Sequence, residues 1–98
     1  LKQNVLSCNF LCIFMIAYIF ATCVPGEENE AISKIKRLSN VHEVNGIMGR
    51  YDIFVKVSAS KEEDLHAVIT AIRDVQSITS TATFAVIRGQ GGSIDDEK

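Results

Sequence analysis

The stretch from Ile16 to Val24 is apolar at nearly every position, with Thr22 as the main interruption. A strand with apolar side chains on both faces belongs in the middle of a sheet, because a one-sided strand alternates with polar residues. The longer apolar run starts at Phe10, yet it is shorter than the about 20 residues that span a bilayer. We therefore expect a central strand here, and neither a membrane segment nor an export signal.

The apolar run also sets the expected domain boundaries. We divide it at Met15 and predict that residues 1–14 form an apolar appendage, residues 15–88 the folded domain, and residues 89–98 a flexible tail that is glycine-rich and then acidic. A chain of 98 residues suits one small domain. At this size a single core leaves much apolar surface exposed, so the composition favours an oligomer.

A hairpin is predicted for the stretch from Asn45 to Val57. Gly46 and Gly49 allow backbone conformations that other residues resist, and the alternation that starts at Ile53 is typical of a strand. The tip carries the polar group Arg50-Tyr51-Asp52. Whether this tip is only a turn or a binding site is the main functional question.

Two helical stretches separate the predicted strands. Acidic residues from Glu27 onward and apolar residues at helical spacing predict a first helix that ends at Ser39-Asn40. A second helix is expected after a capping box formed by Ser60 and Glu63. The last strand is expected from Ile78 to Arg88, with threonines alternating along one face.

The order strand, helix, strand, strand, helix, strand predicts an α+β protein with the ferredoxin-like βαββαβ fold. Right-handed crossovers place both helices on one face of a four-stranded antiparallel sheet. The opposite face carries Tyr18, Phe20 and Phe54, so it also needs a cover. A second copy that packs sheet to sheet is the simplest one, and we expect a dimer that forms through the sheets.

Several functional classes receive no support from the residues. The net charge is −2 and no basic patch is evident, which argues against direct nucleic-acid binding. The three cysteines lie far from the two histidines in sequence, which argues against a metal site, and their odd number argues against a disulfide framework. A reduced, cytoplasmic setting follows. There is no glycine-rich phosphate-binding motif, no nucleophile beside a histidine and no sign of a bound cofactor. Enzymatic activity is therefore not expected.

Residue chemistry does leave a binding site open. Asp52 could accept hydrogen bonds from an ammonium group, and exposed N–H groups around Gly49 and Arg50 could hold a carboxylate. Hydroxyl groups of Ser80, Thr81 and Thr83 could complete a small polar pocket. An amino acid would suit this combination, although hairpin glycines and strand threonines also have purely structural explanations.

Three segments resemble one known family. They are the segment from Met15 to Gly26, the hairpin from Val41 to Val57 with its Gly-x-Tyr-Asp motif, and the closing strand from Ile78 to Phe84 with its Thr-x-Thr pattern. Together they are similar to the effector-binding (RAM) domain of the Lrp/AsnC transcriptional regulators. The resemblance implies a ferredoxin-like domain whose dimers pair through their sheets and often assemble into rings of eight, with amino-acid effectors bound between dimers.

Transferred by position, the resemblance places Gly49, Tyr51 and Asp52 at the effector pocket, with Asp52 as partner of the effector's amino group. Thr81 and Thr83 match the polar closing strand. Arg50 occupies the variable position of the motif, where it is expected to tune specificity or the subunit contact. These six residues are the predicted ligand site.

The implied function is an amino-acid-binding and oligomerisation module involved in transcriptional regulation. The sequence resembles the version without a DNA-binding domain, so full-length Lrp/AsnC regulators are candidate partners alongside further copies of the chain. Two alternatives stay open: a purely structural assembly domain, or a small dimeric α+β-barrel enzyme, which would need a deep polar cavity inside each subunit.

Overall fold

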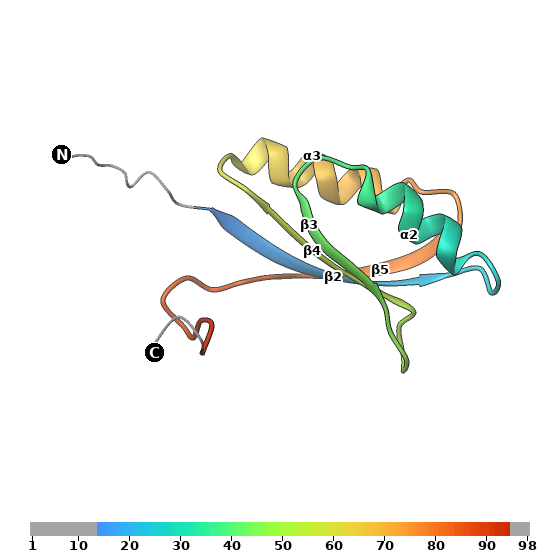
Figure 1. The fold of residues 1–98 in the computed structure, drawn as a ribbon. Helices are drawn as coiled ribbons and strands as arrows, with labels where there is room; N and C mark the ends of the chain where they lie inside the picture. The colour runs from blue at the N-terminus through green and yellow to red at the C-terminus, as the bar shows by residue number, and fades with distance from the viewer. Residues whose placement is uncertain (1–13, 95–98) are drawn as a thin grey trace.

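The computed structural model describes residues 14–94. Its helices and strands follow the order predicted from the sequence (Figure 1). The elements are β2 (Met15–Cys23), α2 (Glu28–Lys36), β3 (Val41–Gly46), β4 (Ile53–Ala59), α3 (Glu62–Arg73) and β5 (Ile78–Ala85). The predicted α+β class is confirmed.

The four strands form one antiparallel sheet in the order β3-β4-β2-β5. This order is the ferredoxin-like arrangement, in which the first strand lies between the third and the fourth. β2 therefore occupies the interior of the sheet, as its two apolar faces predicted. Both helices cover one face of the sheet (Figure 1).

The core lies between the helices and that face. β2 and β4 contribute every second side chain, and these side chains are almost completely buried. From the helices, Ala31 and Ile35 of α2 pack on them together with Val68 and Ile72 of α3. Apolar side chains thus fill the space in which a barrel-like enzyme would need a polar cavity.

The opposite face of the sheet is aromatic and uncovered in the single chain. Phe20 lies at its centre, with ring centroids 5.4 Å from Phe54, 6.0 Å from Phe84 and 5.6 Å from Tyr51. The ring of Tyr18 lies 5.7 Å from that of Phe54. Phe84 is 56% exposed, so this face retains a large apolar surface.

Some predicted boundaries were wrong. The last strand ends at Ala85, three residues before Arg88, because the chain turns between Ile87 and Gln90, where the N–H of Gln90 donates to the carbonyl of Ile87. The capping box is also absent: Lys61 is the N-cap of α3 and no side chain caps the helix. The chain is still extended at Lys61, since β4 runs to Ala59, and the acidic first turn of α3 stabilises the helix start instead.

Two predictions fall largely outside the described residues. The first is the apolar appendage, of which only Phe14 is described; Cys8 and Cys12 belong to it. The second is the tail, whose acidic part after Ile94 is not described. Cys23 lies inside the described region and is buried in the core. Among residues 14–94, no helix is long and apolar enough to cross a membrane.

Candidate functional site

Asp52 ties the predicted hairpin tip to the end of β2. Its backbone N–H donates to the carbonyl of Ala21 at 2.9 Å, and its carbonyl accepts from the N–H of Ile47 at 2.9 Å. Its side chain also has a partner, because carboxylate Oδ2 accepts a hydrogen bond from the backbone N–H of Cys23 at 3.0 Å. The half-buried carboxylate is therefore held in place before any ligand arrives.

The sheet is irregular beside this bond, on the side of β2 that pairs with β5. The register between β2 and β5 shifts between Thr22 and Cys23, so the pairing of Cys23 with Ile78 leaves Thr79 as an extra residue. A β-bulge of this kind bends the strand and redirects its groups. The N–H of Cys23 points to the other side of β2, where the carbonyl of Ala21 also points, and there it reaches the carboxylate of Asp52.

The other residues of the tip differ in their surroundings. Gly49 has φ +142°, a conformation that favours glycine, and nothing lies within 4 Å of the place where a Cβ would sit. Arg50 is exposed, and the neighbouring Met48 is 93% exposed. Tyr51 is half-buried and turns its ring to Phe20 on the aromatic face. The tip thus joins a polar end to an apolar face.

Thr81 and Thr83 lie apart from this tip in the single chain. Thr81 pairs with Ala21 and Thr83 with Ile19, so both threonines belong to the face that the helices cover. Because β2 separates β4 from β5, about 10 Å lies between Asp52 and β5 across the sheet. Thr81 instead lines a polar pocket of about 250 Å³ together with Arg73.

Sequence reasoning missed the hydroxyl group of Thr22, the residue before Cys23. Its Oγ1 lies 2.7 Å from Oγ1 of Thr79 and 2.6 Å from Oγ of Ser80. Simple alternation puts Thr79 and Ser80 on opposite faces, whereas the bulge lets both reach Thr22. The sequence offered one signal, a threonine in an otherwise apolar strand.

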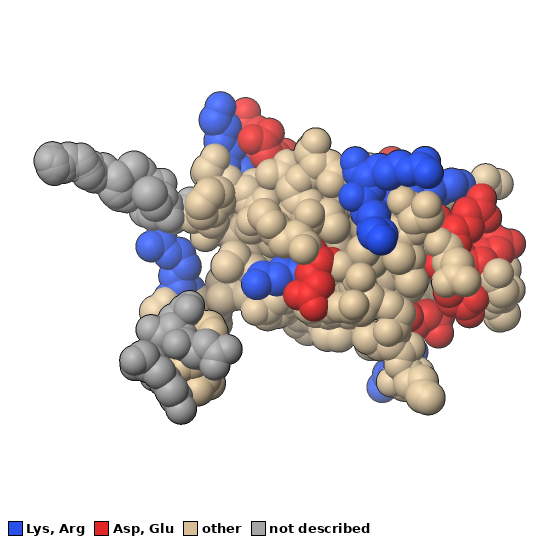
Figure 2. All heavy atoms as spheres, viewed as in Figure 1, with Lys and Arg blue, Asp and Glu red and all other residues tan. Residues whose placement is uncertain are grey.

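Acidic groups gather at this end of the molecule. Burial raises the pKa of the Cys23 thiol above its ordinary value of 9.0, and the negative charges of Glu28, Asp52 and Glu27 raise this pKa further. Figure 2 shows the red acidic side chains clustered at the end where α2 begins. The end of β2 is therefore a region of negative charge that favours cations over anions.

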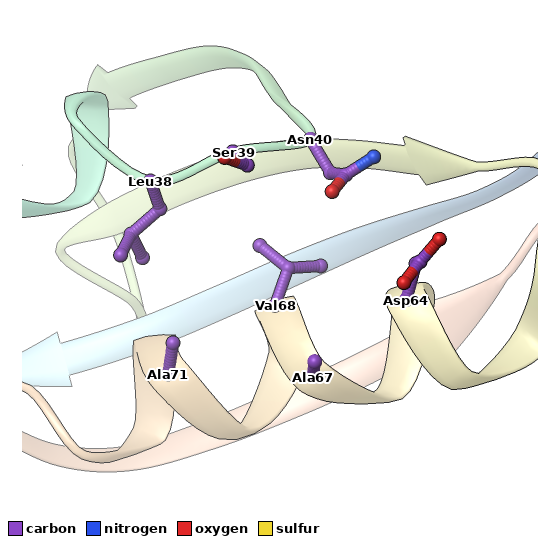
Figure 3. A pocket seen from close by; sticks show the side chains of 7 residues that line it. All are labelled: Leu38, Ser39, Asn40, Asp64, Ala67, Val68 and Ala71. Atoms are coloured by element: carbon purple, nitrogen blue, oxygen red, sulfur yellow. The ribbon is translucent and has the colours of Figure 1, made fainter.

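A separate cavity lies in the helix layer, between α3 and the turn that joins α2 to β3. It has a volume of about 300 Å³, and Figure 3 shows Leu38, Val68 and Ala71 around it, with Asp64 as the charged group at one end. Asn40 borders it with φ 72° and donates from Nδ2 to the carbonyl of Ser58 at 3.0 Å. None of the six predicted site residues lines this cavity.

Comparison with known proteins gives a family match over most of the chain. The model of the Lrp/AsnC ligand binding domain matches residues 16–89. The curated homocitrate synthase of Sulfurisphaera tokodaii is 35% identical over 79 residues, which cover 65% of this chain and 17% of that protein. The chain thus spans about a sixth of the length of this curated relative.

Solved structures agree with the family match. A hypothetical protein from Pyrococcus horikoshii is 32% identical, with a TM-score of 0.70 over 74% of this chain and 89% of that one. A transcriptional regulator from Neisseria meningitidis, solved as a complex with L-Met, has a TM-score of 0.69 over 96% of this chain and 63% of that one. At 11% identity it shows the shared fold alone. On the strength of the family match, the chain belongs to the Lrp/AsnC ligand-binding domain family.

Proposed function

We propose that this chain binds an amino-acid effector at the end of β2, with Asp52 as the acceptor of the effector's ammonium group. The observation that carries the proposal is the state of the Asp52 carboxylate. Oδ2 is occupied by the N–H of Cys23, whereas the hydrogen bonds among residues 14–94 leave Oδ1 without a partner. A fixed carboxylate with one open oxygen is a suitable anchor for an ammonium group.

The surroundings of Asp52 suit this ligand. Glu27 and Glu28 add negative charge near Cys23, which attracts an ammonium group. The hydroxyl cluster of Thr22, Thr79 and Ser80 can donate to a carboxylate, because its two hydrogen bonds use two of its three hydroxyl hydrogens. The exposed N–H groups near Gly49 and Arg50 remain candidate donors for the same carboxylate. Arg50 then serves as a residue that tunes specificity.

A second copy of the chain would complete the site. The aromatic face around Phe20 and Phe84 has the character of a surface that pairs with another sheet. Tyr51 connects this face to Asp52, so a partner on the face would lie beside the effector. Further contacts between dimers, as in a ring, would use the exposed tip at Met48. Thr81 and Thr83 would then line a site that several chains share.

Two settings for such a module have support. Membership of the Lrp/AsnC family favours transcriptional regulation in the cytoplasm, with full-length regulators as partners. The match to homocitrate synthase favours a second setting, in which the same kind of domain regulates an enzyme of which it is a part. In both settings residues 15–88 form the sensing domain and the effector changes assembly.

Calorimetry against the twenty amino acids tests the proposal, combined with light scattering that reports oligomer size. We expect one amino acid, or a small related group, to release heat and to change the size of the oligomer. Asp52→Asn keeps an acceptor for Cys23 but removes the charge, so it should abolish both effects. Asp74→Asn, on an exposed carboxylate after α3, is the matched control and should leave both unchanged.

The opposite results separate the alternatives. Stable oligomers with no heat from any amino acid would favour a purely structural assembly domain. If Asp52→Asn releases the same heat and changes oligomer size as the parent does, this carboxylate does not bind the effector, even if an effector binds elsewhere.

A further inference from the structure

The cavity between α3 and the turn that joins α2 to β3 lies in the helix layer (Figure 3). The helices cover one face of the sheet (Figure 1), whereas the aromatic face with Phe20 and Phe84 lies on the other side. A second copy that packs on the aromatic face would therefore leave this cavity open. Its volume of about 300 Å³ is at the lower end of the range for small-molecule sites, so it suits a small ligand.

One end of the cavity is polar. Figure 3 shows the side chains of Asn40, on the turn, and Asp64, in the first turn of α3, pointing toward one another. Nδ2 of Asn40 donates to the carbonyl of Ser58 at 3.0 Å, which fixes the orientation of the amide. Only the amide nitrogen can donate to a carbonyl, so Oδ1 of Asn40 is the atom that the hydrogen bonds among residues 14–94 leave open.

The charge of Asp64 is not compensated by a cation. The ion pair found among residues 14–94 joins Lys34 to Glu30, so none of the described cations pairs with Asp64. Asp64 also follows two further acidic residues in the first turn of α3. The polar end of the cavity thus combines hydrogen-bond acceptors with negative charge, which attracts cationic donors and repels anions.

The rest of the cavity is apolar. Leu38 on the turn and Val68 on α3 approach it from opposite walls (Figure 3), and Ala67 and Ala71 of α3 line it between and beyond them. Both alanines end at Cβ, which leaves the room that a longer side chain would occupy. Along the axis of α3, Ala71 lies about 10 Å from Asp64, so a short hydrocarbon chain can extend from the polar end along this wall.

We infer that this cavity binds a small molecule in which a primary ammonium group ends a short aliphatic chain. The ammonium group has three donors, and it can donate to the carboxylate of Asp64 and to Oδ1 of Asn40. The aliphatic chain then lies on Leu38 and Val68, where it loses contact with water. A free α-amino acid fits less well, because its carboxylate would lie beside the acidic first turn of α3.

This site is separate from the one proposed at Asp52, and the inference does not depend on that proposal. Asn40 bonds to Ser58, which pairs with Ile16 near the start of β2, whereas Asp52 bonds to Cys23 at its end. Strand geometry puts about 20 Å between Ile16 and Cys23. No local pattern in the sequence signals the site, because residues 38–40 and 64–71 meet only in the folded chain.

The test is a titration of the full chain with n-butylamine at pH 7 and constant ionic strength, followed by amide NMR shifts. n-Butanol supplies the same chain without the charge, and ammonium chloride supplies the charge without the chain. We expect saturable shifts with n-butylamine at residues 38–40 and 64–71, and binding at least about tenfold weaker for the other two compounds.

Three variants examine the two ends of the cavity. Asp64→Asn keeps the shape but removes the charge, so it should weaken amine binding by about tenfold or more. Glu63→Gln removes a neighbouring charge of the same helical turn that does not line the cavity, and as the matched control it should bind as the parent does. Ala67→Leu fills the apolar end with a good helix former and should weaken binding without removing a charge.

Several results would overturn the inference. They are shifts that grow linearly with n-butylamine, n-butanol binding as tight as that of the amine, or equal losses in Asp64→Asn and Glu63→Gln. Asp52→Asn separates this inference from the proposed function, because it should abolish the effector response and leave amine binding unchanged. Loss of amine binding in Asp52→Asn, with Asp64→Asn unaffected, would place the amine at the end of β2 and also overturn the inference.

Discussion

At the scale of single residues, Asp52 serves the fold as well as the proposed ligand. Its Oδ2 holds the N–H of Cys23, and its backbone groups bond to Ala21 and Ile47. The sequence resemblance suggested a role in binding only. A substitution at this position is therefore expected to change both the stability and the proposed binding, and the choice of substituent decides whether the two effects can be separated.

Asp52→Ala should destabilise the protein by about 1–2 kcal/mol, because it leaves the part-buried N–H of Cys23 without a partner. Asp52→Asn should lower the free energy of unfolding by less, since its side-chain oxygen still accepts the hydrogen bond from Cys23 and the acidic cluster loses one repelling charge. Urea denaturation of both variants measures the difference. Equal losses of stability would show that the carboxylate does not hold the end of β2.

The thiol of Cys23 makes stability depend on pH. Its pKa in the folded chain is above the ordinary value of 9.0, so the folded state keeps the proton at pH values where the unfolded chain releases it. The free energy of unfolding should therefore fall as the pH rises above about 9, until the pH reaches the pKa of the folded state.

Cys23→Ala measures this contribution. It should be less stable than the parent at pH 7, because a buried side chain becomes smaller, but its stability should decline less steeply above pH 9. Chemical denaturation at a series of pH values gives both slopes. Parallel slopes would show that Cys23 does not cause the alkaline loss of stability.

At the scale of elements, the turn between α2 and β3 depends on Asn40. It adopts φ 72°, donates from Nδ2 to the carbonyl of Ser58, and accepts from the N–H of Ser58 at 3.0 Å through its own carbonyl. These contacts join the end of the helix layer to β4. Asparagine suits the position because it tolerates the left-handed region better than most residues do.

Asn40→Gly should lose only the side-chain hydrogen bond, whereas Asn40→Ala loses this bond and also strains the backbone. We expect the alanine variant to be less stable than the glycine variant by about 1 kcal/mol. Thermal and urea unfolding of the pair report this difference. A glycine variant less stable than the alanine variant would contradict the role of φ 72°.

The elements themselves were predictable, because alternation and helical spacing report which side chains face the core. β2 and β4 could be recognised from their apolar positions, and both helices from theirs. Their limits were harder to predict, since alternation does not show where the pairing of two strands stops. β5 stops at Ala85, although β2 continues to Met15 and Val86 and Ile87 suit a strand equally well, because the chain turns between Ile87 and Gln90.

The same distinction applies to the candidate site. The tip from Gly49 to Asp52 could be read from the chain, because these residues are neighbours in sequence. The bond from Cys23 to Asp52 could not, because it joins residues 29 positions apart in sequence. The hydroxyl cluster at Thr22 could not either, because it depends on a bulge in the pairing of β2 with β5. A long-range register is not encoded in any one local pattern.

At the scale of the whole molecule, the aromatic face is the surface on which we propose that a second copy packs. Phe84 is 56% exposed and contributes little to the core of one chain, yet it lies beside Phe20 at the centre of the exposed face. An exposed aromatic residue at such a position is a candidate anchor for a partner. The stability of the assembly should therefore respond to this residue much more than the fold does.

Phe84→Ser should raise the dissociation constant of the dimer by about tenfold or more, with little change in the secondary structure of each chain. Sedimentation velocity over a concentration series measures this change. His66→Ser, on the exposed side of α3, is the control and should leave the dissociation constant unchanged. If the parent and Phe84→Ser have the same dissociation constant, the interface lies elsewhere.

The position of β2 between β4 and β5 also has a consequence for the order of folding. Among the strands of residues 14–94, β2 is made first but pairs only with the third and the fourth, so both of its neighbours are made later. Until Ala85 has been synthesised, β2 has apolar side chains on both faces but lacks one of its two partner strands, β5. Synthesis of this chain thus includes an interval in which its most apolar strand is exposed to aggregation, and that interval ends only when β5 closes the sheet.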